Sequence, residues 1–419
     1  MPDTVTRTTS TSWFSRVGSA FAGVLIGIVL IFACVIGLAW NEGRAVKTER
    51  GLKEGAAVVV DIQPSPVVAA NDQKLVHVSG PVAVTAPLED TDFGVTGTGV
   101  HLSRKVEMYQ WRETSKSETR TKLGGGEETV TTYTYAKVWS GSHEDSSAFA
   151  EPNGHQNPEF AIDGADILAQ DATLGDFKLG DDIVGQIGGE APLRLTQDNL
   201  ETVQAAVGEI DKYVSIAQNN IVLSANRPRS ADVDDADDAP PVSPATTTPS
   251  TPTIGDVRVS YDLTPAGVTS IVGKQAGDGF AQYRAKNGEE FLLVSDGAVP
   301  ADEMFQGAQD VNRFITWIVR ILGLVLLMTG FGMILAPLGV IADVLPLAGT
   351  IVRMGTGLVG FVLGLVVGTV TIAIAWFAFR PLLSIGILAV GGLIAFGVYR
   401  LGRGRNKKKL AEAAAAPAA

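Results

Sequence analysis

The residues best suited to metal binding or to general acid–base catalysis are four histidines, His77, His101, His143 and His155. None belongs to an HExxH motif or to another pair at metal-ligand spacing. His155 is the most informative, because it lies in Gly154–Pro158 (GHQNP). A local role in shaping the turn before Pro158 is the main expectation there, and a ligand role is the alternative. We therefore expect neither a metal nor another cofactor.

Other residues that could take part in binding or catalysis also have purely structural interpretations. The single cysteine, Cys34, lies in an apolar stretch, which excludes an intramolecular disulfide and a cysteine zinc site. Gly97–Ser103 (GTGVHLS) lacks the Gly-Lys-Ser/Thr ending of a phosphate loop. Tyr109 and Trp111 alternate along one strand face, as core or as a binding surface. We expect a protein that is not an enzyme, and a membrane-bound hydrolase or a transporter is the alternative.

The apolar residues, 46% of the chain, are concentrated in four blocks. Each block has about 18 residues or more, enough for a helix to cross a hydrocarbon core of ~30 Å. The first block is uncharged from Val17 to Ala39 and ends at bulky Trp40, which favours an uncleaved anchor over a signal peptide. Ala336–Ile351, with Asp343, is predicted to be an interfacial loop or a re-entrant segment. We predict four transmembrane helices, at residues 17–40, about 314–335, 356–379 and 381–399.

Between the first two spans, residues 41–313 are predicted to form a large α+β domain with more strand than helix. The clearest element is a hairpin of Lys105–Arg112 and Val130–Trp139 with a long polar tip. Helices are expected at Ala161–Gln170 and Gln197–Ala206. Residues 1–16 and the acidic, Pro- and Thr-rich insert at residues 227–253 are predicted to be disordered, and residues 401–419 to form a basic and then Ala-rich tail.

The net charge of −12 is unevenly distributed. Residues 314–419 carry nine basic and two acidic side chains, so the negative charge is concentrated in the large domain. Such a domain is not expected to bind nucleic acid. Near the spans there are nine basic residues on the side of the tails and seven on the other side. Because Lys and Arg are more frequent on the cytosolic side of a membrane, this difference is a weak indication that both tails are cytosolic.

Small residues recur at helical spacing in two of the spans. Gly23 and Gly27 lie in the first, and Gly360, Gly364 and Gly368 in the third. Small residues allow helix backbones to approach closely, although glycine is also common in membrane helices. We expect the row in the third span to pack against the fourth span, and Gly23 and Gly27 to mediate self-association.

The exit of the first span, Trp40–Gly55 (WNEGRAVKTERGLKEG), is dense in charges of both signs. Trp is typical of the headgroup level, and Asn and Gly help to end helices. We predict that the span ends here and continues as a short interfacial helix; a solvated linker is the alternative. The predicted membrane-interface residues are Trp40, Asn41, Glu42, Gly43, Arg44, Lys47, Arg380 and Arg400.

Trp40–Gly55 also resembles the exit of the first span in the LUMA family of four-span membrane proteins. The stretches that resemble that family in the same order are Arg104–Trp111 (RKVEMYQW), Gly154–Pro158 (GHQNP), Ile254–Tyr261 (IGDVRVSY) and Phe379–Leu382 (FRPL). The resemblance covers about Val17 to Arg400, while the insert and the tails depart from the family. It singles out Glu107, Met108, Tyr109, Gln110, Trp111, His155, Asn157 and Pro158.

The resemblance implies a large lumenal or extracytoplasmic domain and cytosolic tails. It implies a non-enzymatic scaffold that self-associates and organises membrane partners, as in the nuclear envelope and endoplasmic reticulum. Emerin and lamins are implied only for a eukaryotic member, and a bacterial member would lie in the plasma membrane. The expected partners are membrane lipids, further copies of this chain and other membrane proteins. The family offers no catalytic residues to assign to this sequence.

Overall fold

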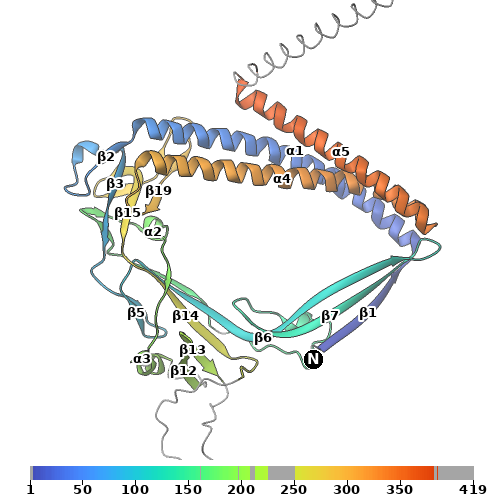
Figure 1. Cartoon of the computed structure of the whole chain (residues 1–419), viewed down its shortest axis with the longest axis horizontal. Coiled ribbons are helices and arrows are strands. Elements are labelled where there is room, and N and C mark those ends of the chain that lie inside the picture. Colours follow the sequence, from blue (N-terminus) through green and yellow to red (C-terminus); the bar gives the residue numbers. More distant parts are fainter. Residues whose placement is uncertain are drawn as a thin grey trace, which may run out of the picture. The chain divides into compact units, whose positions relative to one another are not determined.

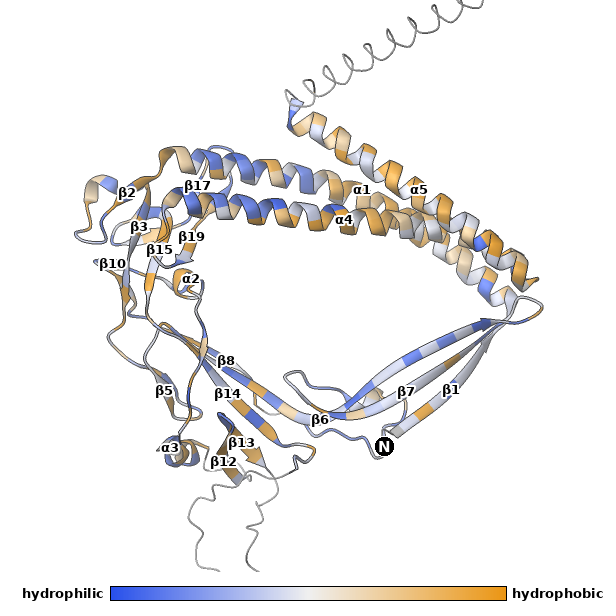
Figure 2. Cartoon of the chain, viewed as in Figure 1, coloured by the Kyte–Doolittle hydropathy of each residue, from blue (hydrophilic) through white to orange (hydrophobic). Residues whose placement is uncertain are grey.

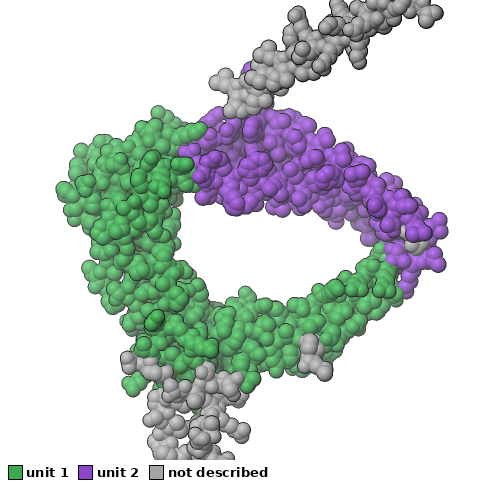
Figure 3. Space-filling view, in the orientation of Figure 1, with its two compact units in different colours: residues 1–10, 51–120, 127–308 green, residues 11–50, 121–126, 309–419 purple. Residues whose placement is uncertain are grey.

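The computed structural model (Figure 1) describes residues 3–160, 162–196, 198–207, 213–224, 251–381 and 385. The chain divides into two compact units, coloured separately in Figure 3. Unit 1 consists of residues 1–10, 51–120 and 127–308 and is rich in strands. Unit 2 consists of residues 11–50, 121–126 and 309–419 and contains most of the length of three long helices.

The three long helices are apolar over much of their length (Figure 2). They are α1 (Trp13–Val58), α4 (Ala301–Ala342) and α5 (Pro346–Phe379). At 1.5 Å per residue, even the 34 residues of α5 extend about 51 Å, more than a hydrocarbon core of ~30 Å. By length and composition, all three can cross a membrane. The predicted fourth span, Arg400 and the tail at residues 401–419 lie outside the described residues, except for positions 381 and 385.

The structure changes two predicted helix boundaries. The stretch after the first span is helical, as predicted and unlike the alternative of a linker, but it is a continuation of α1 through Asn41 and Gly43 to Val58 and not a separate helix. Asn and Gly weaken a helix by only about 1 kcal/mol or less, and tertiary contacts outweigh this preference: the Asn41 side chain donates to the Thr316 carbonyl at 3.4 Å. At the second boundary, only residues 343–345 separate α4 from α5. The segment predicted as a loop or re-entrant structure is therefore helix on both sides of a tight turn.

Glycines allow α4 to approach both other helices closely. A methyl group on Gly27 of α1 would lie 2.7 Å from the Gly330 carbonyl oxygen, and one on Gly364 of α5 would lie 2.6 Å from the Met328 backbone nitrogen. The other glycines of the two rows also face α4; their nearest neighbours are Met333 for Gly23, Gly332 for Gly360 and Leu324 for Gly368. The row of α5 therefore faces α4, whereas the sequence suggested the fourth span, and Gly27 packs against α4 within the chain. Residue spacing defines a helix face but not its partner.

Unit 1 contains two main sheets. The first has the order β1 (Asp3–Thr11), β7 (Glu127–Ser140), β6 (His101–Thr121), β14 (Val257–Thr264), β13 (Asn220–Ser224) and β12 (Tyr213–Ala217), with β11 (Ala191–Pro192) on β14 and β8 (Ala165–Leu168) on β6. The second has the order β10 (Phe177–Lys178), β9 (Thr173–Leu174), β3 (Leu75–Ala83), β15 (Val268–Ala276) and β16 (Gly279–Ala281), with β19 (Leu293–Asp296) on β15 and β2 (Val60–Ile62) parallel to β3.

Smaller elements complete unit 1. Two-stranded sheets are formed by β4 (Leu88–Asp90) with β5 (Val95–Gly97) and by β17 (Tyr283–Arg284) with β18 (Glu290–Phe291). The short helices are α2 (Asp181–Val184) and α3 (Asp198–Ala206), and single 3-10 turns lie at Ala69–Asn71 and Ser146–Ala148. The predicted helix at Gln197–Ala206 is confirmed by α3.

Side chains from both main sheets meet in one core. Burial alternates along β14, so that Val257, Val259 and Tyr261 point inward, as expected for a strand with one face on the core. Buried residues of the other strands in this cluster include Val76, Val78, Leu102, Met108 and Ile271. A second cluster surrounds Leu52 of α1 and is formed by Leu75, Val272, Phe291, Ala301, Met304 and Phe305. The predicted strand-rich α+β domain is thus confirmed.

Two segments of unit 1 correct the sequence interpretation. Asp3–Thr11, expected to be disordered, forms the edge strand β1 beside β7, because its Val and Thr residues suit a strand even without apolar alternation. Ala165–Leu168, expected to be helical, is strand β8, whose Ile167 and Leu168 pack against the core. Of the insert at residues 227–253, only residues 251–253 lie among the described residues.

Candidate functional site

Two of the family-like stretches are neighbouring strands. Arg104–Trp111 lies in β6 and Ile254–Tyr261 leads into β14, and the antiparallel register places Tyr261 opposite Arg104. Because side chains alternate across a strand, Met108 points into the core and is 1% exposed. Segments separated by about 150 positions in the sequence therefore form one surface.

The inner face of this strand pair carries a buried charged cluster. Arg104 Nη1 lies 2.8 Å from both carboxylate oxygens of Asp90 and 2.9 Å from an oxygen of Asp92. The Tyr261 hydroxyl donates to Asp90 at 2.6 Å. Burial, and then the hydrogen bond to the Asp90 carboxylate, raises the pKa of Tyr261, so the hydroxyl keeps its proton. Asp90 is not among the residues predicted from the sequence, because nothing in PLEDTD distinguishes it from a solvated acid.

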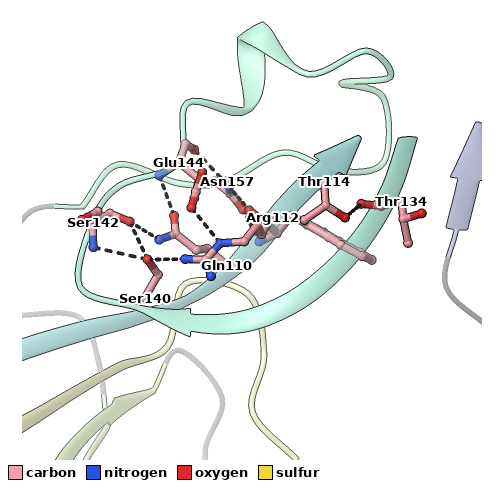
Figure 4. Close-up of polar contacts among 9 residues, drawn as sticks. Gln110, Arg112, Thr114, Thr134, Ser140, Ser142, Glu144 and Asn157 are labelled. Carbon is pink, nitrogen blue, oxygen red and sulfur yellow. Dashed lines mark hydrogen bonds and ion pairs between the residues drawn. The ribbon is translucent and has the colours of Figure 1, made fainter. Parts of the chain in front are cut away.

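Gln110 and Asn157 hold the loop after β7 against β6 (Figure 4). Gln110 is fully buried; its Nε2 donates to the Ser142 carbonyl at 2.6 Å, and its Oε1 accepts from the Glu144 N–H at 3.0 Å. Asn157 Oδ1 accepts from the Trp111 N–H at 2.7 Å, and Nδ2 donates to the carbonyls of Trp111 and Glu144 at 2.9 and 3.0 Å. The Asn157 amide therefore takes the place that a further strand would occupy beside Trp111.

His155 belongs to a buried network in the same loop. Its ring is stacked on Tyr135, with the centroids 3.9 Å apart, and its Nδ1 lies 2.9 Å from the Glu151 carbonyl oxygen. The Tyr135 hydroxyl donates to the Glu113 carboxylate at 2.7 Å and accepts from the Glu151 N–H at 2.9 Å. Burial, followed by the contact with Glu113, raises the pKa of Tyr135 to about 12. These contacts fix the turn, as expected for His155.

The outer face of the strand pair carries a strip of charged and aromatic side chains. The Glu107 carboxylate lies 2.6 Å from Arg258 Nε, and the Arg258 guanidinium lies 4.7 Å from the centre of the Trp139 ring. The centres of the Tyr109 and Trp139 rings are 5.3 Å apart. These side chains are half-buried, so Tyr109 lies between the two alternatives of core and open binding surface. Pro158 is exposed and packs near the backbone of residue 255.

In unit 2, a buried ion pair joins the three helices. Glu42 of α1 accepts hydrogen bonds from Nε and Nη2 of Arg320 of α4, at 2.6 and 2.7 Å. It also accepts from the indole Nε1 of Trp376 of α5, at 2.8 Å. The Glu42 and Arg320 side chains are 2% and 12% exposed. The Arg320 charge is therefore neutralised within the helices of unit 2.

A second charged cluster lies farther along the same helices. The buried Asp343 carboxylate is 2.6 Å from Arg16 Nη2 and 2.7 Å from Arg353 Nη1. Arg16 and Glu42 are 26 residues apart on α1, which corresponds to about 39 Å at 1.5 Å per residue. This separation exceeds a hydrocarbon core of ~30 Å, so the two clusters cannot both lie inside the core of a membrane that α1 crosses along its normal.

The other predicted interface residues lie near the Glu42 cluster. Arg44 Nη1 donates to Asn312 Oδ1 at 3.1 Å, and Arg380 forms an ion pair with Glu49 of α1. The exposed members of this set are Trp40 and Lys47. Among the described residues, no group of three or more His, Cys, Asp and Glu side chains is arranged to hold a metal ion.

The sequence profile of the family described as Transmembrane protein 43 matches residues 108–381. Transmembrane protein 43 of Mus musculus is 28% identical over 404 residues, which cover 93% of each chain. Transmembrane protein 43 of Homo sapiens is 26% identical over 393 residues, or 91% of this chain and 90% of the relative. The Transmembrane protein 43 homolog of Drosophila melanogaster is 25% identical over 379 residues, or 88% and 91%.

No solved structure matches the chain. The profile covers more than half of the sequence, and the relatives align over nearly all of it. Three helices able to cross a membrane agree with that match. This chain is an integral membrane protein and belongs to the Transmembrane protein 43 family, also called the LUMA family.

Proposed function

We propose that this protein is a non-enzymatic membrane scaffold that self-associates and organises protein or lipid partners through its large domain. The observation that carries the proposal is the use of the family-like polar side chains. Gln110 and Asn157 both bind main-chain groups of β6 or of the loop after β7, and His155 contacts the main chain of that loop. Side chains used in this way shape a surface, which is what a binding scaffold requires.

The helices of unit 2 support the role of a stable anchor. Charged side chains inside a membrane are costly and occur mainly where they pair with each other or serve a pathway. Here Glu42 binds both Arg320 and Trp376, which ties α1 to α4 and α5 through polar contacts that apolar side chains cannot supply. Such a bundle provides a fixed base for a scaffold.

The proposed placement follows the family resemblance. The C-terminal tail is cytosolic, and the large domain faces the lumen or the extracytoplasmic space; a cytosolic N-terminal tail is not proposed, because β1 pairs with β7 of the large domain. The membrane is the endoplasmic reticulum or inner nuclear membrane in a eukaryotic cell, where emerin-like and lamin-like partners are expected, and the plasma membrane in a bacterium. Membrane lipids and further copies of this chain are partners in either case.

The test uses the full-length chain in lipid nanodiscs. Mass photometry over a concentration series measures self-association, and affinity purification in mild detergent with mass spectrometry identifies co-purifying proteins. We expect oligomers and a reproducible set of membrane partners. A strictly monomeric chain that enriches nothing over an unrelated three-helix membrane protein would contradict the scaffold.

Transport is the second candidate, because the Glu42–Arg320 pair lies between apolar helices. It predicts ion or solute flux in proteoliposomes that disappears in a Glu42→Gln variant. A scaffold predicts no flux in either the parent protein or the variant. The hydrolase alternative receives no such support, since the hydroxyl of Tyr135 beside His155 is buried and engaged with Glu113.

A further inference from the structure

The edge of β6 that faces away from β7 is open beyond Trp111. Along this edge β14 pairs with His101–Met108, Tyr109 exchanges backbone hydrogen bonds with residues 255 and 256, and the Asn157 amide covers Trp111. Within the described part of the chain, no strand pairs with the following segment on this side. Residues 114–120 are exposed throughout. Exposed strand edges of this kind are templates for pairing with another chain.

The direction of the free backbone groups follows from two independent observations. Successive residues of a strand direct their N–H and C=O groups to alternate edges. Tyr109 and Trp111 direct their backbone N–H and C=O groups to the edge that faces away from β7. By alternation, Ser115, Ser117 and Thr119 direct their backbone groups to the same edge. On the side of β7, the hydroxyl groups of Ser117 and Thr131 form a hydrogen bond of 2.9 Å. Such close side chains are typical of a pair that is not hydrogen-bonded through its backbone.

The exposed sequence 114–120, TSKSETR, is complementary to itself in an antiparallel arrangement. Hydrogen-bonded pairs across the edge must join residues 115, 117 and 119, since only these direct backbone groups outward. With Ser117 opposite its own copy, Lys116 of each chain faces Glu118 of the other. Opposite charges directly across a strand pair are stabilising, and like charges are destabilising.

The neighbouring registers are disfavoured by charge. A slip that places Ser115 opposite Ser117 puts Lys116 opposite Lys116. A slip in the other direction, with Ser117 opposite Thr119, puts Glu118 opposite Glu118 and Lys116 opposite Arg120. The alternating charges thus favour one register, which has a two-fold axis at residue 117.

We propose that two copies of this chain associate by antiparallel pairing of their β6 edges over residues 115–119, centred on Ser117. The proposal rests on the self-association proposed above and names its surface. The arrangement is a closed, two-fold interface, in which the strands β1, β7 and β6 of each copy continue into those of the other. Three hydrogen-bonded residue pairs and two reciprocal Lys116–Glu118 contacts hold it.

The charge test uses full-length chains in nanodiscs. Lys116→Glu and Glu118→Lys each place like charges across the axis and should weaken dimerisation by roughly tenfold or more. Both side chains are highly exposed, 81% and 60%, and the 3.3 Å ion pair that they form within one chain is a surface pair, so each variant is expected to fold like the parent protein. When the two variants are co-expressed, their charges are again opposite, and a mixed dimer should form as strongly as the parent dimer. Lys178→Glu, at an exposed site on β10 in the other sheet, is the matched control.

The register test uses single cysteines in a Cys34→Ala background. Residues in a hydrogen-bonded antiparallel pair lie ~5.5 Å apart at Cα, within disulfide range, so Ser117→Cys should form an interchain disulfide. In the same register the two copies of residue 115 are about 14 Å apart, so Ser115→Cys should not. An oligomer that survives Lys116→Glu and gives no Ser117→Cys disulfide would overturn this interface and leave self-association intact. A chain that stays monomeric would refute both proposals.

Discussion

Replacing Arg320 by Met tests whether the buried ion pair stabilises the helices of unit 2. The substitution keeps a long unbranched side chain but removes the charge and both hydrogen bonds to Glu42. The Glu42 carboxylate is 2% exposed. In the variant, the indole N–H of Trp376 is the member of this cluster that still donates to it. The free energy of unfolding should fall because a buried charge has lost its counterion.

The expected size follows from the burial of the pair. Removing one partner of a buried ion pair costs about 3–5 kcal/mol, since the remaining charge is neither solvated nor neutralised. An exposed pair contributes only ~0.2–1 kcal/mol. The matched control is Arg313→Met on the same helix, because Arg313 and its partner Asp310 are 71% and 53% exposed. The difference between the two variants should therefore be about 2 kcal/mol or more.

A second substitution distinguishes charge from packing. Glu42→Gln combined with Arg320→Met removes both charges, while an amide oxygen can still accept from Trp376. This double variant should recover much of the lost stability, because the uncompensated carboxylate is gone. The measurement is reversible unfolding in mixed micelles, followed by tryptophan fluorescence. The reasoning is refuted if Arg320→Met differs from Arg313→Met by less than about 1 kcal/mol, or if the double variant is less stable than Arg320→Met alone.

Three further outcomes are expected. Gly364→Ala should destabilise the helices by about 1–3 kcal/mol, because its methyl group meets the Met328 backbone. Gly357→Ala on the same helix has open space around it and should be neutral or stabilising. Thermal unfolding in detergent compares the two variants. Asn157→Asp keeps an acceptor for the Trp111 N–H but loses both donated hydrogen bonds, which should reduce the free energy of unfolding of the loop after β7 by about 2 kcal/mol or more. The loop should then become sensitive to limited proteolysis, and protection equal to that of the parent protein would contradict this. The pKa of Tyr135 is raised from about 10 to about 12, so the contribution of its protonated hydroxyl to stability is fully present below pH 10 and is lost as the pH rises toward 12. A Tyr135→Phe variant should therefore lose less stability between pH 10 and pH 12 than the parent protein does. Alkaline unfolding monitored by circular dichroism measures this difference.

Local pattern alone predicted much of the architecture. The apolar blocks located α1, α4 and α5, since a helix that crosses a membrane needs a continuous apolar run of sufficient length. β-branched and aromatic residues located the β6–β7 hairpin, and a glycine run located its tip. The family-like stretches singled out Gln110, His155 and Asn157 but did not predict what these side chains contact.

Tertiary structure decided the rest, because contacts between distant segments leave no periodic signal in the chain. Glu42 and Arg320 are 278 positions apart, and Tyr261 and Asp90 are 171 apart, so neither pair could be recognised from spacing. The same holds for the partner of the α5 glycines and for β1, whose strand depends on β7 beside it. α1 passes through Asn41 and Gly43 because contacts with other helices outweigh a local preference of about 1 kcal/mol, and such contacts exist only once the chain has folded.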